Sequence, residues 1–381
     1  MAFTVGTNFR GVNLLKQSAF NTPLNVASTL AGCAFGMVDD ESFRGVYDVI
    51  ERNDMSLNVV NSTVRGKFYS EGTINMALDN SEFVARILSG IFPMDTVSTP
   101  TGTVKLHTMT PINHANGYNA TATYPVFTMY VMRDERMAIY PSMSVNRVAL
   151  SASVGEYVSM SADFLGMAPG SHASNDGTNI EAATIAAFAA NGEGPHNLEP
   201  IHFVNSKIYF ANNATASQIV SSFDIEFNLN RDLDASYGLG SDTCVRAPPP
   251  QQLSITGNIE FMRPTSSAGS TNNSPYDEPD MDSLLDTAAG SLSNPGSGND
   301  ALKLEFGTGN ELITLELYNL RFGAPESTLS GRDTQTMRIP FTALYDNNDA
   351  NMIAQLLIKT DAPAKNSGHL GWPSTISVDL G

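Results

Sequence analysis

Positively charged side chains are scarce in this chain. Lys and Arg number 21 against 39 Asp and Glu, which gives a formal net charge of −18 over 381 residues. An acidic surface repels phosphate backbones, so a protein that coats nucleic acid non-specifically is excluded. No run approaches the roughly 18 apolar residues of a membrane helix. Residues 1–6 lack the basic and apolar stretches of a signal peptide, so we expect no secretory signal.

Cysteine and charge of either sign are also sparse. The two cysteines, Cys33 and Cys244, lie far apart and form no metal-binding spacing. The sequence does not exclude a disulfide between them. The simpler interpretation is that both thiols stay reduced in the cytoplasm. Charged residues make up 16% of the chain, while Gly (30) and Pro (20) are frequent. This mixture is typical of a β-rich chain with many turns.

Alternation of apolar and polar residues with period two recurs along the chain and predicts half-buried strands. The clearest runs are 223–229 and 253–261, and Gly257 on the apolar face of the second run indicates a bulge or a close backbone approach. Residues 126–132 are apolar on both faces, so we expect them to be buried on both sides. Further strands are predicted near 64–70, 103–109, 126–132, 143–150, 157–165, 201–210, 302–306, 312–321 and 335–344.

Helices are few. Residues 81–91 have apolar residues at helical spacing, Asn80 or Ser81 as N-cap and Gly90 near the end. Residues 282–289 have acidic residues in the first turn and a glycine after the last. A third candidate, 180–190, lies in a Gly-, Asn- and Ala-rich stretch, 168–199, that is typical of a crossover between domains. The Ser-, Gly-, Asn- and Pro-rich stretch 263–300 predicts an exposed insertion.

A weak internal repeat follows from the order of these elements. The strand 64–68, the helix 81–91 and the strand 104–106 have counterparts at 255–259, 282–289 and 302–304. Each half then ends in a meander, with 157–164 matching 334–341. We therefore predict a mainly β fold with two tandem domains, 1–167 and 200–381, joined by the crossover 168–199. Each domain is expected to be a β-sandwich or barrel flanked by one short α-helix.

Catalytic motifs are missing. The sequence has no nucleophile elbow, phosphate-binding loop, GxGxxG or HExxH motif. His196 and His202 are a conceivable metal pair, but one loop histidine and one strand histidine is the favoured interpretation, and His107 is expected to be solvated or at an interface. The acidic stretches 277–282 and 346–351 lack the full ligand pattern of a calcium loop, and we predict turns there. No feature selects a carboxylate pair for glycoside cleavage. We predict no catalytic residue, no metal, no cofactor and no enzymatic activity.

Three segments carry a resemblance to a known family. They are residues 8–23 (NFRGVNLLKQSAFNTP), the V-x-G-x-F strand at 64–68, and residues 222–230 (SFDIEFNLN) followed by YGLG at 237–240. With them, the chain resembles the major tail tube proteins of long-tailed bacteriophages over nearly its whole length. The resemblance implies a structural virion protein, located in the virion tail and assembled in the host cytoplasm, whose rings stack into a tube for genome ejection into the host.

The same resemblance implies the partners of the chain. These are further copies of itself and the tape measure, tail terminator and distal tail proteins, with genomic DNA passing through without specific binding and no membrane contact. Family members usually have one domain and form six-membered rings. Two domains in one chain suggest instead three chains per ring with pseudo-sixfold symmetry.

Barrel geometry independently favours a polymer. A barrel of about eight strands is filled by its own side chains, and an aqueous bore needs roughly sixteen or more. Several chains must therefore share one sheet, which also pairs their open edges. Carboxylates on the inner wall would repel phosphates over a screening length of about 8–10 Å. The bore candidates are Glu71, Asp224, Glu226 and Glu260; alternatively, these acids face outward or pair with Arg65, Lys67 or Lys303.

Three segments, 1–30, 31–58 and 232–250, are longer than ordinary hairpin connections and carry apolar residues. We expect them to reach neighbouring subunits or the next ring, through Phe9, Phe20, Phe35, Val46, Tyr47, Tyr237 and Leu239. Two other functions stay open from the sequence. A capsid, decoration or receptor-binding protein of a virion would form small closed oligomers, and a carbohydrate-active β-sandwich enzyme would lose activity when one carboxylate pair is replaced.

Overall fold

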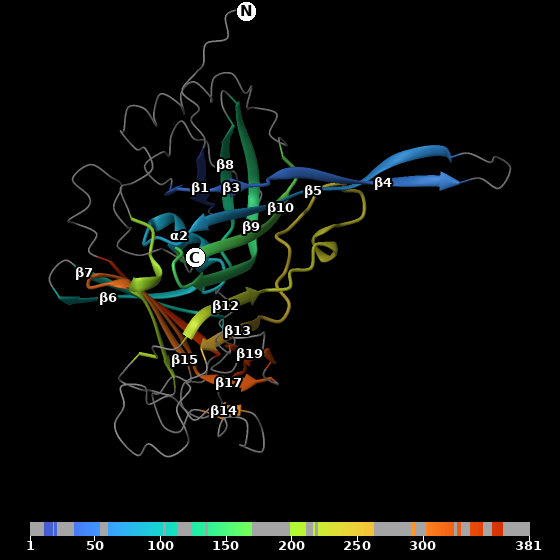
Figure 1. Ribbon diagram of the computed structural model, residues 1–381. Helices are drawn as coiled ribbons and strands as arrows, with labels where there is room; N and C mark the ends of the chain where they lie inside the picture. The colour runs from blue at the N-terminus through green and yellow to red at the C-terminus, as the bar shows by residue number, and fades with distance from the viewer. Residues whose placement is uncertain are drawn as a thin grey trace, which may run out of the picture.

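The computed structural model describes most of the chain between residues 11 and 360 (Figure 1). The described residues are 11–17, 19–20, 34–53, 60–101, 104–112, 123–133, 136–169, 199–210, 216–217, 220–262, 291–293, 302–323, 326–328, 336–345 and 353–360.

The described elements before residue 170 are strands with one short helix among them. They are β1 (Gly11–Lys16), β2 (Ala34–Gly36), β3 (Asp40–Glu41), β4 (Arg44–Asn53), β5 (Val60–Ala77), α2 (Glu82–Ser89), β6 (Met94–Thr101), β7 (Val104–Thr110), β8 (Phe127–Arg133), β9 (Arg136–Ser153) and β10 (Ser159–Met167).

The elements after residue 199 are strands and two short 3-10 turns. They are η2 (Phe203–Asn205), β11 (Ser206–Phe210), β12 (Val220–Asn228), η3 (Asp234–Ser236), β13 (Ser254–Met262), β14 (Ser291–Ser293), β15 (Leu302–Thr308), β16 (Glu311–Leu317), β17 (Asn319–Phe322), β18 (Glu326–Thr328), β19 (Thr336–Ala343) and β20 (Ala354–Thr360).

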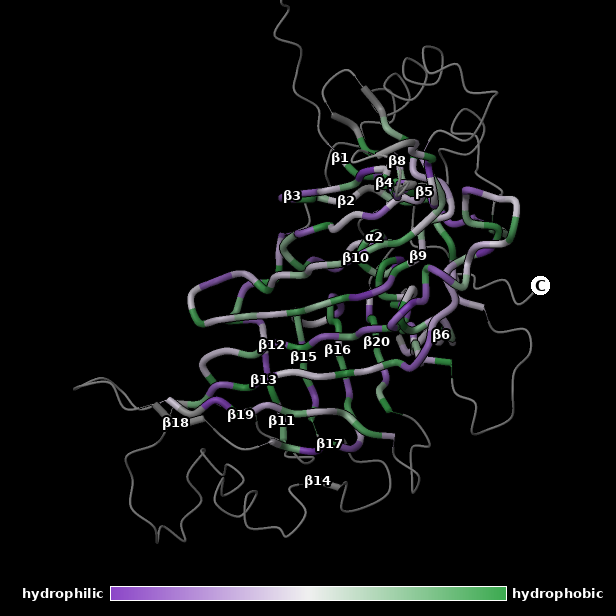
Figure 2. Tube along the Cα trace, turned by 90° about the vertical axis from the view of Figure 1, so that its right-hand side faces the viewer, coloured by the Kyte–Doolittle hydropathy of each residue, from purple (hydrophilic) through white to green (hydrophobic). Residues whose placement is uncertain are grey.

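The strands form two antiparallel sheets. The larger has the order β14-β17-β19-β13-β12-β9-β10-β5-β3, with β4 also beside β5 and β18 beside β19. The first part of β9 pairs with β8, which continues to β1 and β2. The smaller sheet has the order β11-β15-β16-β20-β7-β6. Its strands β15, β16 and β20 cross the direction of β12 and β13, as in sheets packed at a steep angle (Figure 2). The mainly β prediction is confirmed.

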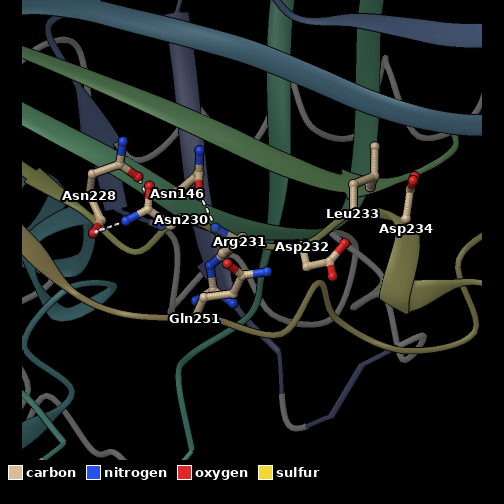
Figure 3. A pocket seen from close by; sticks show the side chains of 8 residues that line it. All are labelled: Asn146, Asn228, Asn230, Arg231, Asp232, Leu233, Asp234 and Gln251. Atoms are coloured by element: carbon tan, nitrogen blue, oxygen red, sulfur yellow. Dashed lines mark hydrogen bonds between the residues drawn. The ribbon is translucent and has the colours of Figure 1, made fainter.

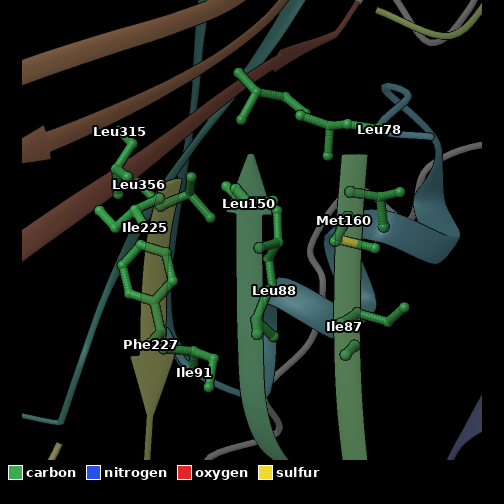
Figure 4. Close-up of a cluster of buried hydrophobic side chains, with 14 of the residues drawn as sticks. Leu78, Ile87, Leu88, Ile91, Leu150, Met160, Ile225, Phe227, Leu315 and Leu356 are labelled. Carbon is green, nitrogen blue, oxygen red and sulfur yellow. The ribbon is translucent and has the colours of Figure 1, made fainter. Parts of the chain in front are cut away.

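The hydrophobic core lies between the two sheets and around α2. Figure 4 shows Ile225 and Phe227 of the large sheet beside Leu315 and Leu356 of the small one. Ile87 and Leu88 of α2 extend the same core beneath β9 and β10, where Leu150 and Met160 are buried. Each such side chain contributes about 1.5–3 kcal/mol when fully buried. The large sheet therefore keeps one face dry and leaves the other for water or partners.

The helix α2 begins and ends where its sequence predicts. The Ser81 side chain accepts a hydrogen bond from the Val84 N–H at 3.2 Å, which satisfies one of the open donors of the first turn. Gly90 follows the last residue as C-cap. Ser81, one of the two predicted N-caps, is thus confirmed. The predicted helices 180–190 and 282–289 lie outside the described residues.

Most predicted strands are confirmed, with ends shifted by a few residues. Residues 127–131 are all buried, as their two apolar faces indicated. Gly257 does mark a close approach, because a Cβ added there would lie 2.4 Å from the Asp224 carbonyl oxygen and 2.5 Å from the Phe341 ring. The interpretation of 31–58 as a long connection was wrong, since it contains β2, β3 and β4. The strands β1, β6, β14, β18 and β20 were also missed, so the predicted connection 1–30 and the predicted insertion 263–300 each contain a strand of the large sheet.

Candidate functional site

The large sheet has one continuous polar face. Phe223, Ile225 and Phe227 of β12 point into the core, so Asp224 and Glu226 lie on the opposite face. Strand alternation places two further acids on this face. Glu260 lies between buried Ile259 and Phe261, and Glu71 between buried Ser70 and Gly72. All four acids that the sequence singled out therefore share one face of one sheet.

Cross-strand contacts neutralise most of these acids. Arg147 of β9 contacts Glu226 at 2.9 Å and Asp163 of β10 at 3.1 Å. Arg338 of β19 contacts Asp224 at 3.1 Å. The Arg147 pairs join neighbouring strands, whereas the Arg338–Asp224 pair crosses over β13, and the side chains stay about one third to one half exposed.

The remaining two acids also have neighbours. Glu71 accepts from Arg44 at 2.7 Å, and Glu260 accepts from the Ser222 hydroxyl at 2.9 Å. The predicted partners were wrong: Arg65 pairs with Asp242, Lys67 with Asp234 and Lys303 with Glu305. The register of the sheet explains the difference, because it sets Arg44 directly opposite Glu71 and Arg147 within reach of two strands.

A long hairpin of β4 and β5 protrudes from the body (Figure 1). The strand β5 pairs with β10 only as far as Tyr69, so its preceding residues extend past the sheet together with β4. Apolar side chains on this hairpin are exposed: Tyr47 by 58%, Ile50 by 62% and Val64 by 64%. Val46 is half-buried. A protruding apolar surface of this kind is typical of a protein–protein contact.

Residues 232–246 brace the base of the hairpin. The Lys67 ammonium contacts Asp234 at 2.6 Å, and the Phe68 N–H donates to the Asp242 carbonyl at 2.7 Å. The Tyr237 hydroxyl donates to the Phe68 carbonyl at 3.2 Å, and burial raises the pKa of that tyrosine. Leu239 is fully exposed beside it. The predicted contact segment 232–250 therefore lies against β5, the strand that pairs with β4 of the other predicted segment, 31–58.

The structure says less about three other predicted contact residues, Phe9, Phe20 and Phe35. Phe9 lies outside the described residues. Phe20 is half-buried in the turn after β1. Phe35 lies in β2 opposite Asn13, and its side chain is outside the described part of the chain.

A surface cavity of about 570 Å³ opens at the end of β12, beside Asn146 in the interior of β9 (Figure 3). Its floor contains Arg231, which is only 8% exposed. The Arg231 guanidinium donates to the carbonyls of Val145 and Pro248, both at 2.6 Å, and lies 5.1 Å from the centre of the Tyr124 ring. Burial lowers its pKa to about 10. Arg231 thus ties the segment after β12 to β9, a role the sequence did not reveal. The cavity is lined by Asn146, Asn228, Asn230, Arg231, Asp232, Leu233, Asp234 and Gln251.

The histidines do not build a site in the part of the chain that the structure describes. His107 is fully buried and its Nδ1 lies 2.9 Å from Asp95, so the expected solvated or interface position was wrong. His202 contacts the rings of Tyr157 and Phe203. His196 and the acidic stretches 277–282 and 346–351 lie outside the described residues.

The described residues lack two kinds of feature. No group of three or more His, Cys, Asp or Glu is placed to hold a metal ion. No helix is long and apolar enough to cross a membrane.

Comparison with protein families identifies the chain. A family model described as phage tail tube protein matches residues 60–343, which include the four acids of the polar face, strand β5 of the hairpin and the brace 232–246. No curated protein matches the chain. The match covers well over half of the sequence, so the chain belongs to the phage tail tube protein family and is a non-enzymatic structural protein of the virion tail that polymerises into the tail tube.

Proposed function

We propose that the chain is a tandem repeat of one tube-forming unit, so that three chains build a ring of pseudo-sixfold symmetry. The support is a strand order that occurs twice. In the first half, β1, β8, β9, β10, β5 and β4 pair in that sequence of neighbours. The second half repeats this order if β16 and β17 are counted as one strand. The neighbours are then β11, β15, β16 with β17, β19, β13 and β12.

A shared detail in the strand pairs supports the same equivalence. Phe164 of β10 lies opposite Gly72 of β5, and Phe341 of β19 lies opposite Gly257 of β13. In each half a phenylalanine thus faces a glycine at the middle of the unit. This matches Phe164 with Phe341, as the sequence repeat did, but matches Gly257 with Gly72 rather than with Gly66.

An irregularity also recurs at the next strand. From Asp163 to Phe164, β10 advances one residue while β9 moves two, from Arg147 to Val145. From Arg338 to Phe341, β19 advances three residues while its partners move four, from Glu326 of β18 to Phe322 of β17. Bulges are specific features of a fold rather than random events. Under the proposed repeat, β16 is the counterpart of the first part of β9, and β17 with β18 is the counterpart of its last part.

We propose that the polar face of the large sheet lines the bore. Without β14, the sheet has eight strand positions per chain. Three chains give twenty-four, which exceeds the roughly sixteen strands at which a closed barrel holds an aqueous channel. The opposite face is already buried against the core, so the polar face is the one available to water and passing DNA.

The charges on this face refine the predicted acidic lining. Glu71, Asp163, Asp224 and Glu226 contact Arg44, Arg147 or Arg338. Paired charges present a weak net field to a polyanion and expose few unpaired donors that could hold a phosphate. We therefore propose a weakly acidic wall along which DNA passes without specific binding. The remaining negative charge would come from Glu260, which accepts a hydrogen bond from the Ser222 hydroxyl rather than from an arginine.

The protruding hairpin and its brace are proposed to contact neighbouring subunits, including the next ring. The exposed apolar side chains of Tyr47, Ile50 and Val64 support this proposal, as does fully exposed Leu239 in the brace. The residues 1–30 are proposed to take part as well. The tape measure, tail terminator and distal tail proteins are proposed to bind the finished tube at its bore and its two ends.

Labelling of assembled tubes tests which face lines the bore. In a Cys33→Ser background, Thr256→Cys places a thiol on the polar face, and Lys207→Cys places one on the outer side of the small sheet. A maleimide carrying a long polyethylene glycol should modify Lys207→Cys in tubes and leave Thr256→Cys unmodified, while both react in dissociated chains. Equal reaction of Thr256→Cys in tubes and in dissociated chains would refute the bore assignment.

A further inference from the structure

At two edges of the large sheet, the outermost strands have a single partner strand each among the described residues. At one end, β3 and β4 pair only with β5. At the other, β18 pairs only with β19, while β14 covers residues 319–321 of the neighbouring β17. A free strand edge presents unpaired N–H and C=O groups that favour pairing with another chain. These two edges are therefore the places where the sheet can continue.

The chain already contains one such continuation. The strands β12 and β9 join the two halves of the large sheet, from Ser222 opposite Ser153 to Asn228 opposite Arg147. The inference made here rests on the tandem repeat proposed above. Under that repeat, β3 and β4 are the counterparts of β12, and β17 with β18 is the counterpart of the last part of β9. The internal junction is then a template for the junction between chains.

The register of the template can be transferred residue by residue. Glu41 lies opposite Ile74 and Arg44 opposite Glu71, which puts Phe43 beside Gly72. Ile225 lies opposite Gly257, the counterpart of Gly72, so Phe43 corresponds to Ile225. Ser42 and Arg44 therefore correspond to Asp224 and Glu226.

The other side of the junction follows from β19. Thr328 lies opposite Thr336 and Glu326 opposite Arg338, whereas Ser151 lies opposite Ser159. Because Phe164 corresponds to Phe341, Ser159 corresponds to Thr336, and Thr328 therefore corresponds to Ser151. By the same shift, Glu326 corresponds to Ala149. In the internal junction, Asp224 lies opposite Ser151 and Glu226 opposite Ala149.

We propose that β3 and β4 of one chain pair antiparallel with β18 of a second copy, with Ser42 opposite Thr328 and Arg44 opposite Glu326. The register places residues of opposite charge directly across the junction, which favours a cross-strand pair. The Arg44 side chain is 71% exposed and sits at the edge of the sheet. The strand β14 stops short of β18, so it does not block this pairing.

In the single chain, side chains bond to backbone groups of Phe43 at the edge formed by β3 and β4. The Phe43 N–H donates to the Glu41 carboxylate at 3.0 Å, and its carbonyl accepts from the Tyr140 hydroxyl at 2.9 Å. Side-chain contacts of this kind blunt an edge against indiscriminate pairing. Pairing with β18 of the second copy exchanges the Glu41 contact for backbone hydrogen bonds.

Disulfide trapping tests the register. Residues directly opposite in an antiparallel pair have Cα atoms roughly 4.5–5.5 Å apart, which suits a disulfide. The double variant Ser42→Cys with Thr328→Cys, in a Cys33→Ser background, is assembled into tubes and oxidised. A denaturing gel without reductant should show covalent species that end at three chains. The matched control, Ser42→Cys with Ser327→Cys, is one residue out of register and should give at least fivefold less product.

The outcomes separate the inference from the proposals beneath it. Tubes in which the 42–328 pair forms no more product than the 42–327 pair would overturn the register, and the tube function would stand. A ladder that extends to six chains would keep the junction and overturn the three-chain ring.

If the cysteine variants do not assemble, exchanging the charges of residues 44 and 326 tests the same junction. Arg44→Glu alone should abolish assembly, and adding Glu326→Arg should restore tubes at near wild-type yield. Failure of this restoration, with both variants folded, would overturn the inference.

Discussion

Arg147 of β9 lies 2.9 Å from Glu226 of β12, across the strand pair that joins the two halves of the large sheet. The same guanidinium reaches Asp163 of β10, so one arginine contacts a carboxylate on each of the two strands that flank β9. Ion pairs on the polar face therefore connect the strands at the junction between the two units of the proposed repeat.

Replacing this arginine should weaken the sheet moderately. Each exposed pair contributes about 0.2–1 kcal/mol, and Arg147→Met also leaves Asp163 and Glu226 facing each other. We expect a loss of about 1–2 kcal/mol in the free energy of unfolding, measured by urea denaturation of the unassembled chain. Lys207→Met, which removes an exposed cation from the small sheet, is the control and should leave the midpoint unchanged. Unaltered stability of Arg147→Met in low salt would show that the pairs contribute nothing.

Gly257 is required by close packing. A Cβ at this position would meet the Asp224 carbonyl and the Phe341 ring, at 2.4 and 2.5 Å. Gly257→Ala should therefore force strands apart and cost about 1–3 kcal/mol. Gly238→Ala is the matched control, since its nearest neighbour is 3.8 Å away. The thermal midpoints of the two variants provide the comparison; equal midpoints would contradict the packing argument.

The buried Arg231 should be intolerant of replacement. Arg231→Met leaves the carbonyls of Val145 and Pro248 without their donor, and each lost buried contact costs about 1–3 kcal/mol. Arg231→Lys should recover little, because one ammonium cannot reproduce the planar fork. Hydrogen exchange should show faster opening of residues 229–251 in both variants. Protection equal to that of the wild type would show that this segment is held by other contacts.

The N-cap of α2 offers a local test. Ser81→Ala removes the acceptor for the Val84 N–H and should cost about 1 kcal/mol, whereas Ser81→Asp should keep most of the stability. Urea midpoints measure both. An Ala variant as stable as the Asp variant would mean that this hydrogen bond is dispensable.

The exposed hairpin should matter for assembly and not for folding. Tyr47→Ser with Ile50→Ser changes side chains that are 58% and 62% exposed, so the free energy of unfolding should stay within about 0.5 kcal/mol of the wild-type value. Tube yield, counted by negative-stain microscopy, should fall at least tenfold. Val204→Ser, at an equally exposed site outside the hairpin, should assemble normally. Normal tubes from the double variant would exclude the hairpin from subunit contacts.

Alternation predicted the strands whose polar and apolar residues separate cleanly, such as β12 and β13. It missed β4, because Tyr47, Val49 and Ile50 are apolar but exposed, so no single face of this strand is dry. It also placed His107 on the wrong side. The burial of β7 follows His107 and Met109 rather than Leu106, and the Asp95 contact makes a buried histidine possible.

The polar face itself could be predicted, but its ion pairs could not. Each acid's position follows from its apolar neighbours within one strand. Its partner depends on which strands pair and in which register, and Asp224 and Arg338 are 114 residues apart in sequence. The proposed equivalence of Gly72 with Gly257 could not be derived from the sequence for the same reason, since only paired strands show which glycine faces a phenylalanine.

The central claim is that three two-unit chains share one closed sheet whose polar face lines the bore. A cryo-electron microscopy reconstruction of tubes assembled from the full chain measures this directly. The account predicts rings of three chains with six similar lobes and a continuous wall of strands, with Asp224, Glu226 and Arg147 facing the bore. Rings of six chains, or a bore lined by the small sheet, would contradict it.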